Sequence, residues 1–235
     1  MVSKELVDKL LLAIDTATRV ASLALHDGAQ VHVELTWETD NYHTVELVPR
    51  IAGMLAQLKA SVDNLAGVAV SLGPGSFTGV RAGVAAAKGM CLARNLPIYG
   101  VCTFDVMAQA QAPGDPPWPL VVVIRAGRGR VCAARYTWHP PTWQIEGEAW
   151  LASLPTLGEE WEGTTSVCGE LNAAERHALQ TRLGKRVRLA QPAASLRRAG
   201  YLAEIGWHRL RHGQADDLAT LAPIYLRTPG SPPER

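Results

Sequence analysis

The stretch that decides the fold lies between residues 71 and 81 and is Ser71-Leu72-Gly73-Pro74-Gly75-Ser76-Phe77-Thr78-Gly79-Val80-Arg81. It follows a short apolar run, 67–72, that is typical of a buried strand. It opens a longer run of small and apolar residues, 80–96, that predicts a helix. A strand that turns through glycines into a helix leaves unpaired backbone N–H groups at the positive end of the helix dipole. The stretch therefore predicts an α/β unit with a shaped loop between strand and helix.

This loop matches neither of the two common phosphate-binding patterns. A P-loop needs a second glycine five residues after the first, but that position, counted from Gly75, is Val80. A dinucleotide fingerprint needs glycine at the position of Thr78. Ser76 or Thr78 can cap the helix by accepting a hydrogen bond from its first turn. A tight turn packed against a neighbouring segment is the simplest interpretation.

A second interpretation of the loop involves the turn after the first strand. The apolar run 10–14 predicts a central strand, and the polar residues Asp15 and Thr16 follow it. Together with Gly73, Gly75 and Ser76 they would make a residual nucleotide or anion site. A polar turn that closes a hairpin explains Asp15 and Thr16 equally well.

Composition excludes several classes of protein. The 235 residues include 23 Lys and Arg against 22 Asp and Glu, so no strong basic field indicates nucleic-acid binding. The 4 cysteines are scattered without a Cys-x-x-Cys pair, which favours buried free thiols in a reducing compartment. The charged N-terminus is unlike a signal peptide. No apolar run reaches the roughly 20 residues of a membrane span. We expect a soluble, cytoplasmic protein.

The order of the predicted elements is repeated along the chain. The first series is strands 10–14, 20–25 and 31–37, helix 44–59, strand 67–72, helix 80–96 and strand 98–101. The second is strands 120–124, 131–138, 143–150 and 165–168, helix 173–183, strand 187–190 and helix 195–211. A proline-rich stretch, 112–117, separates them. The repeat predicts a duplicated α/β fold with domains 1–110 and 111–228 and a disordered tail, 229–235.

Three stretches together resemble the bacterial TsaB family, the non-catalytic paralogue of TsaD in tRNA threonylcarbamoyladenosine biosynthesis. They are Leu12-Ala13-Ile14-Asp15-Thr16-Ala17-Thr18, residues 73–81 of the glycine loop, and Pro223-Ile224-Tyr225-Leu226-Arg227. The resemblance covers nearly the whole chain and is weakest from 113 to 198. It implies a duplicated actin-like, Hsp70-like (ASKHA) fold. It also implies a heterodimer with TsaD, assembly with the ATPase TsaE, a homodimer of the isolated chain, and contact with tRNA only through the complex.

Two positions bear on whether the chain is itself a catalyst. In the catalytic paralogue, the strand after the glycine-loop helix is followed by a His-x-x-x-His pair that holds a metal. The matching positions here are about Thr103 and Met107, which offer no nitrogen ligand. After the second apolar run, where the family often keeps Asp, stands Arg125, which cannot coordinate magnesium. We therefore predict no catalytic residue, no metal and no cofactor, apart from the residual nucleotide site above.

The positive function then rests on a surface. Two adjacent helices carry more apolar residues than one sheet face needs, and the resemblance implies that the family pairs through these helices. The predicted partner interface consists of Leu47, Ile51, Met54, Leu55, Phe77, Arg81, Val84 and Lys88. Packing within the chain's own domain is the alternative for this stripe.

Two other functions remain open at this point. One is an actin-like ATPase or sugar kinase that uses Asp15 and the glycine loop, for which ATP turnover lost on Asp15→Ala would be the sign. The other is a metallopeptidase, against which the missing ligand pair argues. The sequence favours an accessory subunit, without bond-breaking chemistry, of a tRNA-modifying threonylcarbamoyltransferase complex.

Overall fold

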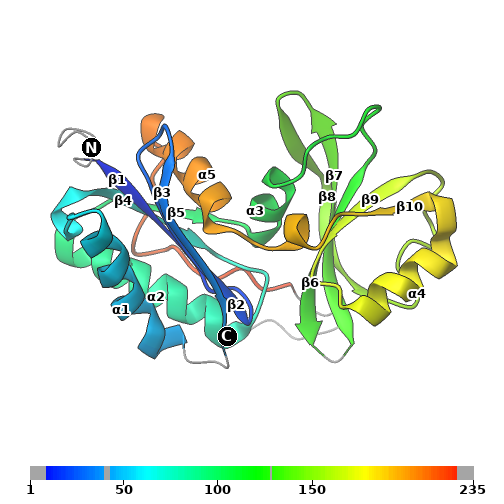
Figure 1. Cartoon of the computed structure of the whole chain (residues 1–235), viewed down its shortest axis with the longest axis horizontal. Helices are drawn as coiled ribbons and strands as arrows, with labels where there is room; N and C mark the ends of the chain where they lie inside the picture. The colour runs from blue at the N-terminus through cyan, green and yellow to red at the C-terminus, as the bar shows by residue number, and fades with distance from the viewer. Residues whose placement is uncertain (1–8, 40–42, 128, 227–235) are drawn as a thin grey trace. The chain divides into compact units, whose positions relative to one another are not determined.

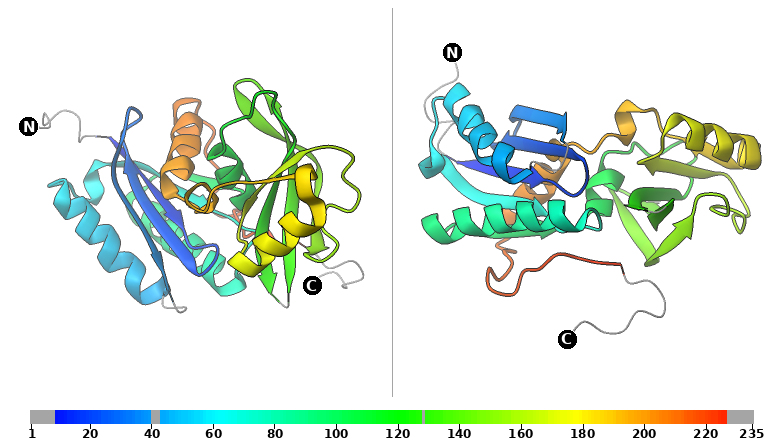
Figure 2. Two further views of the ribbon diagram at one scale, coloured as in Figure 1. Left: turned by 45° about the vertical axis from the view of Figure 1, so that its right-hand side comes forward. Right: turned by 90° about the horizontal axis from the view of Figure 1, so that it is seen from below.

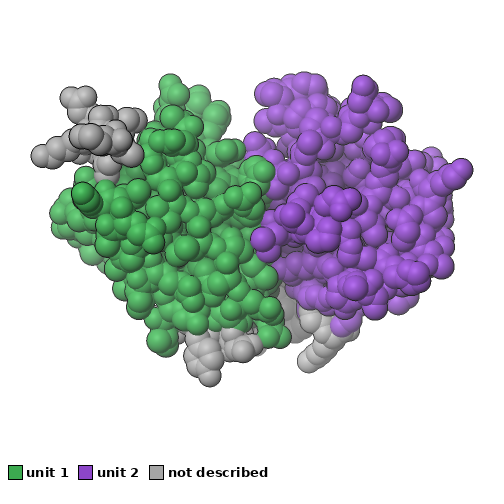
Figure 3. Space-filling model, viewed as in Figure 1, with its two compact units in different colours: residues 1–106, 197–223 green, residues 107–196, 224–235 purple. Residues whose placement is uncertain are grey.

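The computed structural model describes residues 9–39, 43–127 and 129–226. It consists of two compact units (Figures 1 and 3). Unit 1 contains residues 1–106 and 197–223, and unit 2 contains residues 107–196 and 224–235. The predicted disordered tail, 229–235, and Arg227 lie outside the described residues. No helix in the described part of the chain is long and apolar enough to span a membrane.

Unit 1 is built on a five-stranded sheet in the order β3-β2-β1-β4-β5. The strands are β1 (Leu10–Asp15), β2 (Val20–His26), β3 (Val31–Glu38), β4 (Leu65–Ser71) and β5 (Ile98–Val101). β1 pairs antiparallel with β2 and parallel with β4, with Ile14 opposite Val70. Every residue of β1 is buried, as its continuous apolar sequence predicts for a strand covered on both faces.

Helices cover both faces of the sheet in unit 1 (Figures 1 and 2). Helices α1 (His43–Gln57) and α2 (Phe77–Arg94) pack on one face with Leu12 and Ile14, and α5 (Ala199–Arg211) packs on the other with Leu11 and Ala13. Successive β1 residues point to opposite faces, so this one strand contributes to both cores. Gly206 brings α5 close, because a Cβ there would lie 2.6 Å from the Cβ of Ala69.

Unit 2 repeats the strand order of unit 1. Its sheet has the order β10-β9-β6-β7-β8, which is the same path traced from the opposite edge. The strands are β6 (Leu120–Gly127), β7 (Arg130–His139), β8 (Thr142–Ser153), β9 (Thr165–Gly169) and β10 (Val187–Leu189). Helix α4 (Ala173–Leu183) packs Leu179 and Leu183 on one face of this sheet (Figure 2). The predicted duplication of the α/β fold is confirmed.

The two units differ from a perfect repeat in their helices. Residues 154–160 of unit 2 form turns, at the point in the sequence where unit 1 has α1. Helix α3 (Thr103–Gln109) follows β5, and short 3-10 helices lie at η2 (Val62–Asn64), η3 (Gly184–Arg186) and η4 (Ala193–Ser195). The last predicted helix, 195–211, therefore begins only at Ala199, because the chain makes a 3-10 turn first.

The predicted domain boundaries need a correction. We placed α5 in a second domain, 111–228, but residues 197–223 belong to unit 1. Leu202 and Ala203 of α5 fill the face of the first sheet opposite α1 and α2. The periodicity of a helix shows which of its sides is buried, but not which sheet buries it, so the sequence pattern alone assigned α5 to the nearer half.

The four cysteines are free thiols, as predicted. Cys91, Cys132 and Cys168 are buried, and Cys102 is partly buried. Burial raises the pKa of Cys91, Cys102 and Cys132 to about 11 each, and it raises the pKa of Cys168 as well. A thiol that stays protonated near neutral pH is a poor nucleophile and a poor metal ligand, so these side chains act as small apolar groups.

Candidate functional site

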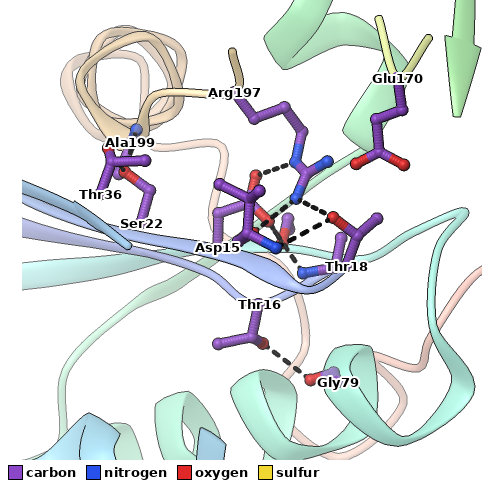
Figure 4. A network of polar contacts seen from close by, with 12 residues as sticks. Asp15, Thr16, Thr18, Ser22, Thr36, Gly79, Glu170, Arg197 and Ala199 are labelled. Carbon is purple, nitrogen blue, oxygen red and sulfur yellow. Dashed lines mark hydrogen bonds and ion pairs between the residues drawn. The ribbon is translucent and has the colours of Figure 1, made fainter. Parts of the chain in front are cut away.

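The carboxylate at the end of β1 is bonded entirely within unit 1. Asp15 is fully buried. Its Oδ1 accepts hydrogen bonds from the backbone N of Ala17 at 2.9 Å and from Ser71 Oγ at 3.0 Å. Its Oδ2 accepts one from Nε of Arg197 at 2.9 Å (Figure 4). Both carboxylate oxygens therefore have partners from the chain itself.

The cation in this network comes from the residue at which the chain returns to unit 1. Arg197 lies two residues before α5, and its side chain is 2% exposed. Its Nη2 donates to Thr18 Oγ1 and to the carbonyl oxygen of Val20, each at 2.8 Å (Figure 4). A buried charge is tolerated only when it is paired and hydrogen-bonded, and Arg197 meets both conditions.

The glycine loop packs directly on the turn that follows Asp15. The backbone N of Ser76 donates to the carbonyl oxygen of Ala17 at 2.5 Å. A Cβ at Gly75 would lie 2.0 Å from that same oxygen, so only glycine allows this approach. Thr16 Oγ1 donates to the carbonyl oxygen of Gly79 at 2.7 Å (Figure 4). The loop is a tight turn closed on its neighbour, which is the simplest interpretation of its sequence.

The other predicted loop residues have structural contacts of the same kind. Gly73 has a φ of 98°, which favours glycine, and its carbonyl oxygen accepts from the backbone N of Thr103 at 2.8 Å. Ser76 is the N-cap of α2, with its Oγ accepting from the N of Gly79 at 3.3 Å. The anion site predicted for Asp15, Thr16, Gly73, Gly75 and Ser76 stays a prediction, and in this structure the same residues bond or pack within the chain.

The corresponding strand end of unit 2 also carries an ion pair. Arg125 follows the apolar part of β6 as Asp15 follows that of β1. Its guanidinium binds both carboxylate oxygens of Glu175, at 3.1 and 2.6 Å, and its backbone N donates to Glu170 Oε2 at 3.0 Å. Glu175 also accepts from the backbone N of Asn172 in the capping box of α4. This pair is partly exposed, with side-chain exposures of 45% and 20%.

The two positions compared with the metal-holding pair of the catalytic paralogue are both buried on α3. Thr103 is 0% exposed and Met107 is 1% exposed. The hydroxyl of Thr103 is buried and has no hydrogen-bond partner among the residues that the structure describes. Across residues 9–39, 43–127 and 129–226, no group of three or more His, Cys, Asp or Glu side chains is placed to hold a metal ion.

Five residues of the predicted partner interface are core residues instead. Leu47, Ile51, Met54, Leu55 and Val84 are between 1% and 5% exposed and pack in the core with β1, β2 and β4. The apolar stripe that we assigned to a partner is the side of each helix that faces the sheet of unit 1. A periodic apolar stripe marks a buried helix face and does not say what buries it.

The other three predicted interface residues are at the surface to different degrees. Phe77 is 52% exposed, and the guanidinium of Arg81 lies 3.7 Å from the centre of its ring. Lys88 is partly buried, and its Nζ donates to the carbonyl oxygen of Ala219 at 3.4 Å. Phe77 and Arg81 therefore mark the exposed side of α2.

The exposed side of α1 and α2 consists largely of apolar and small residues, and of these the sequence analysis identified only Phe77 and Arg81. We call it the outer helix face; it consists of Val45, Val48, Ala52, Gly53 and Ala56 on α1, and Phe77, Arg81, Ala85, Gly89, Leu92 and Ala93 on α2. Val45, Val48 and Leu92 are 70%, 63% and 77% exposed. A Cβ at Gly53 or Gly89 would meet no atom of the described residues within 4 Å. The available signal was that α1 is apolar on both of its sides.

Comparison of structures identifies the class of protein. The two sheets share one strand order and helices pack on each, which makes this a duplicated actin-like α/β fold. A Pseudomonas aeruginosa structure described as an uncharacterized protein with similarity to peptidase YeaZ has a TM-score of 0.76 at 20% identity, covering 93% of this chain and 100% of its own. Component A of (R)-2-hydroxyglutaryl-CoA dehydratase from Acidaminococcus fermentans has a TM-score of 0.52 at 10% identity, over 86% of this chain and 99% of its own. Both likenesses concern the fold.

Comparison of sequences identifies the family. The family model described as "TsaD: tRNA N6-adenosine threonylcarbamoyltransferase" matches residues 37–231. The chain is 36% identical over 137 residues to the tRNA threonylcarbamoyladenosine biosynthesis protein TsaB of Escherichia coli, a region that covers 55% of this chain and only 58% of that protein. It is 32% identical over 230 residues to an uncharacterized Mycobacterium tuberculosis protein, covering 94% of this chain and 93% of the other. The chain therefore belongs to the family that this TsaD model describes, and over about half of its length it is similar to TsaB proteins.

Proposed function

We propose that this chain is a non-catalytic accessory subunit for threonylcarbamoyl transfer to the adenosine beside the tRNA anticodon. It pairs with the catalytic paralogue TsaD, recruits the ATPase TsaE, and meets tRNA only through that complex, in the cytoplasm. The isolated chain forms a homodimer through the same surface. Family membership supports this role, because the relatives from Escherichia coli and Haemophilus influenzae are proteins of tRNA threonylcarbamoyladenosine biosynthesis.

The observation that carries the proposal is the outer helix face. Val45, Val48 and Leu92 are exposed apolar side chains on two helices that pack against each other. Gathered apolar exposure of this kind marks an interaction site. Gly53 and Gly89 cost helix stability, on the order of 1 kcal/mol each relative to alanine. Since no described residue requires a glycine at either position, a helix of a partner that approaches closely accounts for them.

The non-catalytic part of the proposal is supported by the residues at the strand ends. Both oxygens of Asp15 are engaged by groups of this chain, so a metal-bound phosphate would have to displace Arg197. Thr103 and Met107 offer no imidazole nitrogen, and both are buried. The chain's contribution to the reaction is then a surface that a catalytic subunit binds.

Reconstitution of adenosine modification with TsaD, TsaE and this chain tests the proposed function. A variant on the outer helix face tests whether that surface is the one that binds TsaD. Val84 is unsuitable because it is buried, so we choose Ala85→Arg, which places a charge on the exposed side of α2. We expect adenosine modification by TsaD and TsaE to require this chain, and Ala85→Arg to abolish both co-elution with TsaD and modification. The melting temperature should stay close to that of the parent, because surface substitutions change stability by only about 0.5 kcal/mol.

Ala178→Arg is the matched control, since Ala178 is an exposed residue of helix α4 in unit 2. It should leave co-elution and modification unchanged. Modification at the full rate without this chain, or unchanged co-elution of the Ala85→Arg variant, would contradict the proposal.

A further inference from the structure

We propose that the guanidinium of Arg197 supplies the positive charge that a bound cation would otherwise supply beside Asp15. It holds the turn after Asp15 against the glycine loop, and in this way it positions the first turn of α2 within the outer helix face without a bound ligand. Arg197 is in this view a positioning residue for partner binding. The inference rests on the proposed function, because it assumes that the outer helix face binds the catalytic paralogue.

The first step is the contact between Arg197 and the turn. Its guanidinium reaches Asp15, Thr18 and the carbonyl oxygen of Val20, so it spans the turn from one strand to the next. These groups are buried or partly buried, and buried polar groups that lose a partner are costly. Moving the turn would break these hydrogen bonds, so the guanidinium holds the turn in one position.

The second step is the contact between the turn and α2. The carbonyl oxygen of Ala17 accepts from the backbone N of Ser76, the N-cap of α2. The hydroxyl of Thr16 donates to the carbonyl oxygen of Gly79, three residues after Ser76. Gly83 of α2 also packs closely against the turn, because a Cβ there would lie 2.2 Å from Thr16 Oγ1. Since these contacts are at packing distance, a shift of the turn moves the start of α2.

The third step is the contact between the start of α2 and the surface. Phe77 is the first residue of α2 and Arg81 lies one turn later; both are exposed, and the guanidinium of Arg81 lies over the ring of Phe77. Aromatic and arginine side chains are the ones that most often dominate binding at protein interfaces. The buried network thus sets the direction of two side chains that a partner would contact.

The residue types at the end of β1 also suit a bound ligand. A carboxylate at a strand end beside a glycine loop at a helix start can hold a metal-bound phosphate. Here a guanidinium that is always charged supplies the cation. The first turn of α2 should then be ordered in the free chain, with no dependence on magnesium or nucleotide.

Two substitutions interrupt the network at different contacts. Arg197→Lys keeps the charge but cannot reach Asp15, Thr18 and Val20 with one ammonium group. Thr16→Val keeps the shape but removes the hydrogen bond to Gly79. Arg198→Lys is the matched control, because Arg198 is the neighbouring arginine but pairs with Glu34 on β3 and is 52% exposed.

Two measurements on these variants test the inference. Amide hydrogen exchange of residues 77–81 in the isolated chain should become faster in Arg197→Lys and Thr16→Val, while exchange in α1 and in the control stays at the parent rate. The dissociation constant for TsaD should rise by up to about tenfold in both variants and not in the control. Magnesium with ATP should leave exchange of residues 77–81 in the parent chain unchanged.

Either of two results overturns the inference: parent-like exchange at residues 77–81 in both variants, or slower exchange there when magnesium and ATP are added to the parent. If Arg197→Lys does not fold, Thr16→Val decides alone. A parent chain that does not bind TsaD would contradict the proposed function, whereas the exchange measurement would still decide whether Arg197 orders α2.

Discussion

The ends of β1 and β6 occupy the same place in the two repeated sheets, but they have different charges and surroundings. Asp15 ends the apolar run of β1 and pairs with Arg197, and their side chains are 0% and 2% exposed. Arg125 ends the apolar run of β6 and pairs with Glu175, and their side chains are 45% and 20% exposed. At each strand end, the charged side chain is paired with an oppositely charged side chain of the same chain. The difference is burial, and burial decides how much each pair contributes to stability.

The two pairs also join very different parts of the chain. Asp15 and Arg197 are separated by 182 residues, so their bond holds the returning segment and α5 on the first sheet. Arg125 and Glu175 are separated by 50 residues and join a strand to the next helix of the same unit. The first pair therefore contributes to the cooperative folding of unit 1, while the second fixes a local connection at the surface.

The largest effect is expected when one member of the buried pair is removed. Arg197→Met leaves the carboxylate of Asp15 buried without its cation, and breaking a buried pair in this way costs about 3–5 kcal/mol. Chemical denaturation with parallel circular dichroism and tryptophan fluorescence measures the loss. A loss below about 1 kcal/mol would mean that the network is wetter than the structure shows.

A double-mutant cycle sharpens the same comparison. Asp15→Asn combined with Arg197→Met removes both charges, and the amide oxygen can still accept from Ala17 and Ser71. We expect the double variant to lose clearly less than the sum of the single variants, with a coupling of about 2–3 kcal/mol. The same cycle for Arg125→Gln and Glu175→Gln should give a coupling below about 1 kcal/mol. Equal couplings at the two strand ends would remove burial as the explanation.

The helix caps beside the two strand ends give the next smaller effect. Ser76 caps α2 and Asn172 caps α4, and each accepts a hydrogen bond from its own helix. Replacement by alanine should cost about 1 kcal/mol in each case. Ser76→Ala should in addition speed exchange in residues 77–81, because this cap lies against the turn after Asp15, whereas Asn172→Ala should change exchange only in α4. Equal local effects would show that the turn adds nothing to the order of α2.

The sequence predicted the strands, their repeat and the closed glycine loop, because each leaves a local pattern. The apolar run 10–14 and the glycines at 73 and 75 are of this kind. Arg197 could not be predicted as the partner of Asp15, since nothing in the residues near it indicates a contact so far back in the chain. The exposed side of α1 was missed for a different reason. A helix that is apolar on two sides has one side for the sheet and one for something else, and periodicity alone led us to assign the stripe containing Leu47 to the partner.

The smallest effect is expected at the exposed strand end, and it tests the comparison from the other direction. Arg125→Gln removes one member of a partly exposed pair, so the loss should stay within about 1 kcal/mol, less at high salt. Glu175 keeps the backbone N of Asn172 as a partner and can turn toward water, so no charge is left buried. Denaturation of Arg125→Gln and of the parent at low salt and in about 1 M sodium chloride should give a difference that shrinks as salt rises, because screening at that ionic strength acts within about 3 Å. For Arg197→Met the difference should hardly depend on salt, since ions do not reach a pair with side-chain exposures of 2% and 0%. A salt-independent loss of several kcal/mol in Arg125→Gln would mean that the strand end of unit 2 is as tightly closed as that of unit 1.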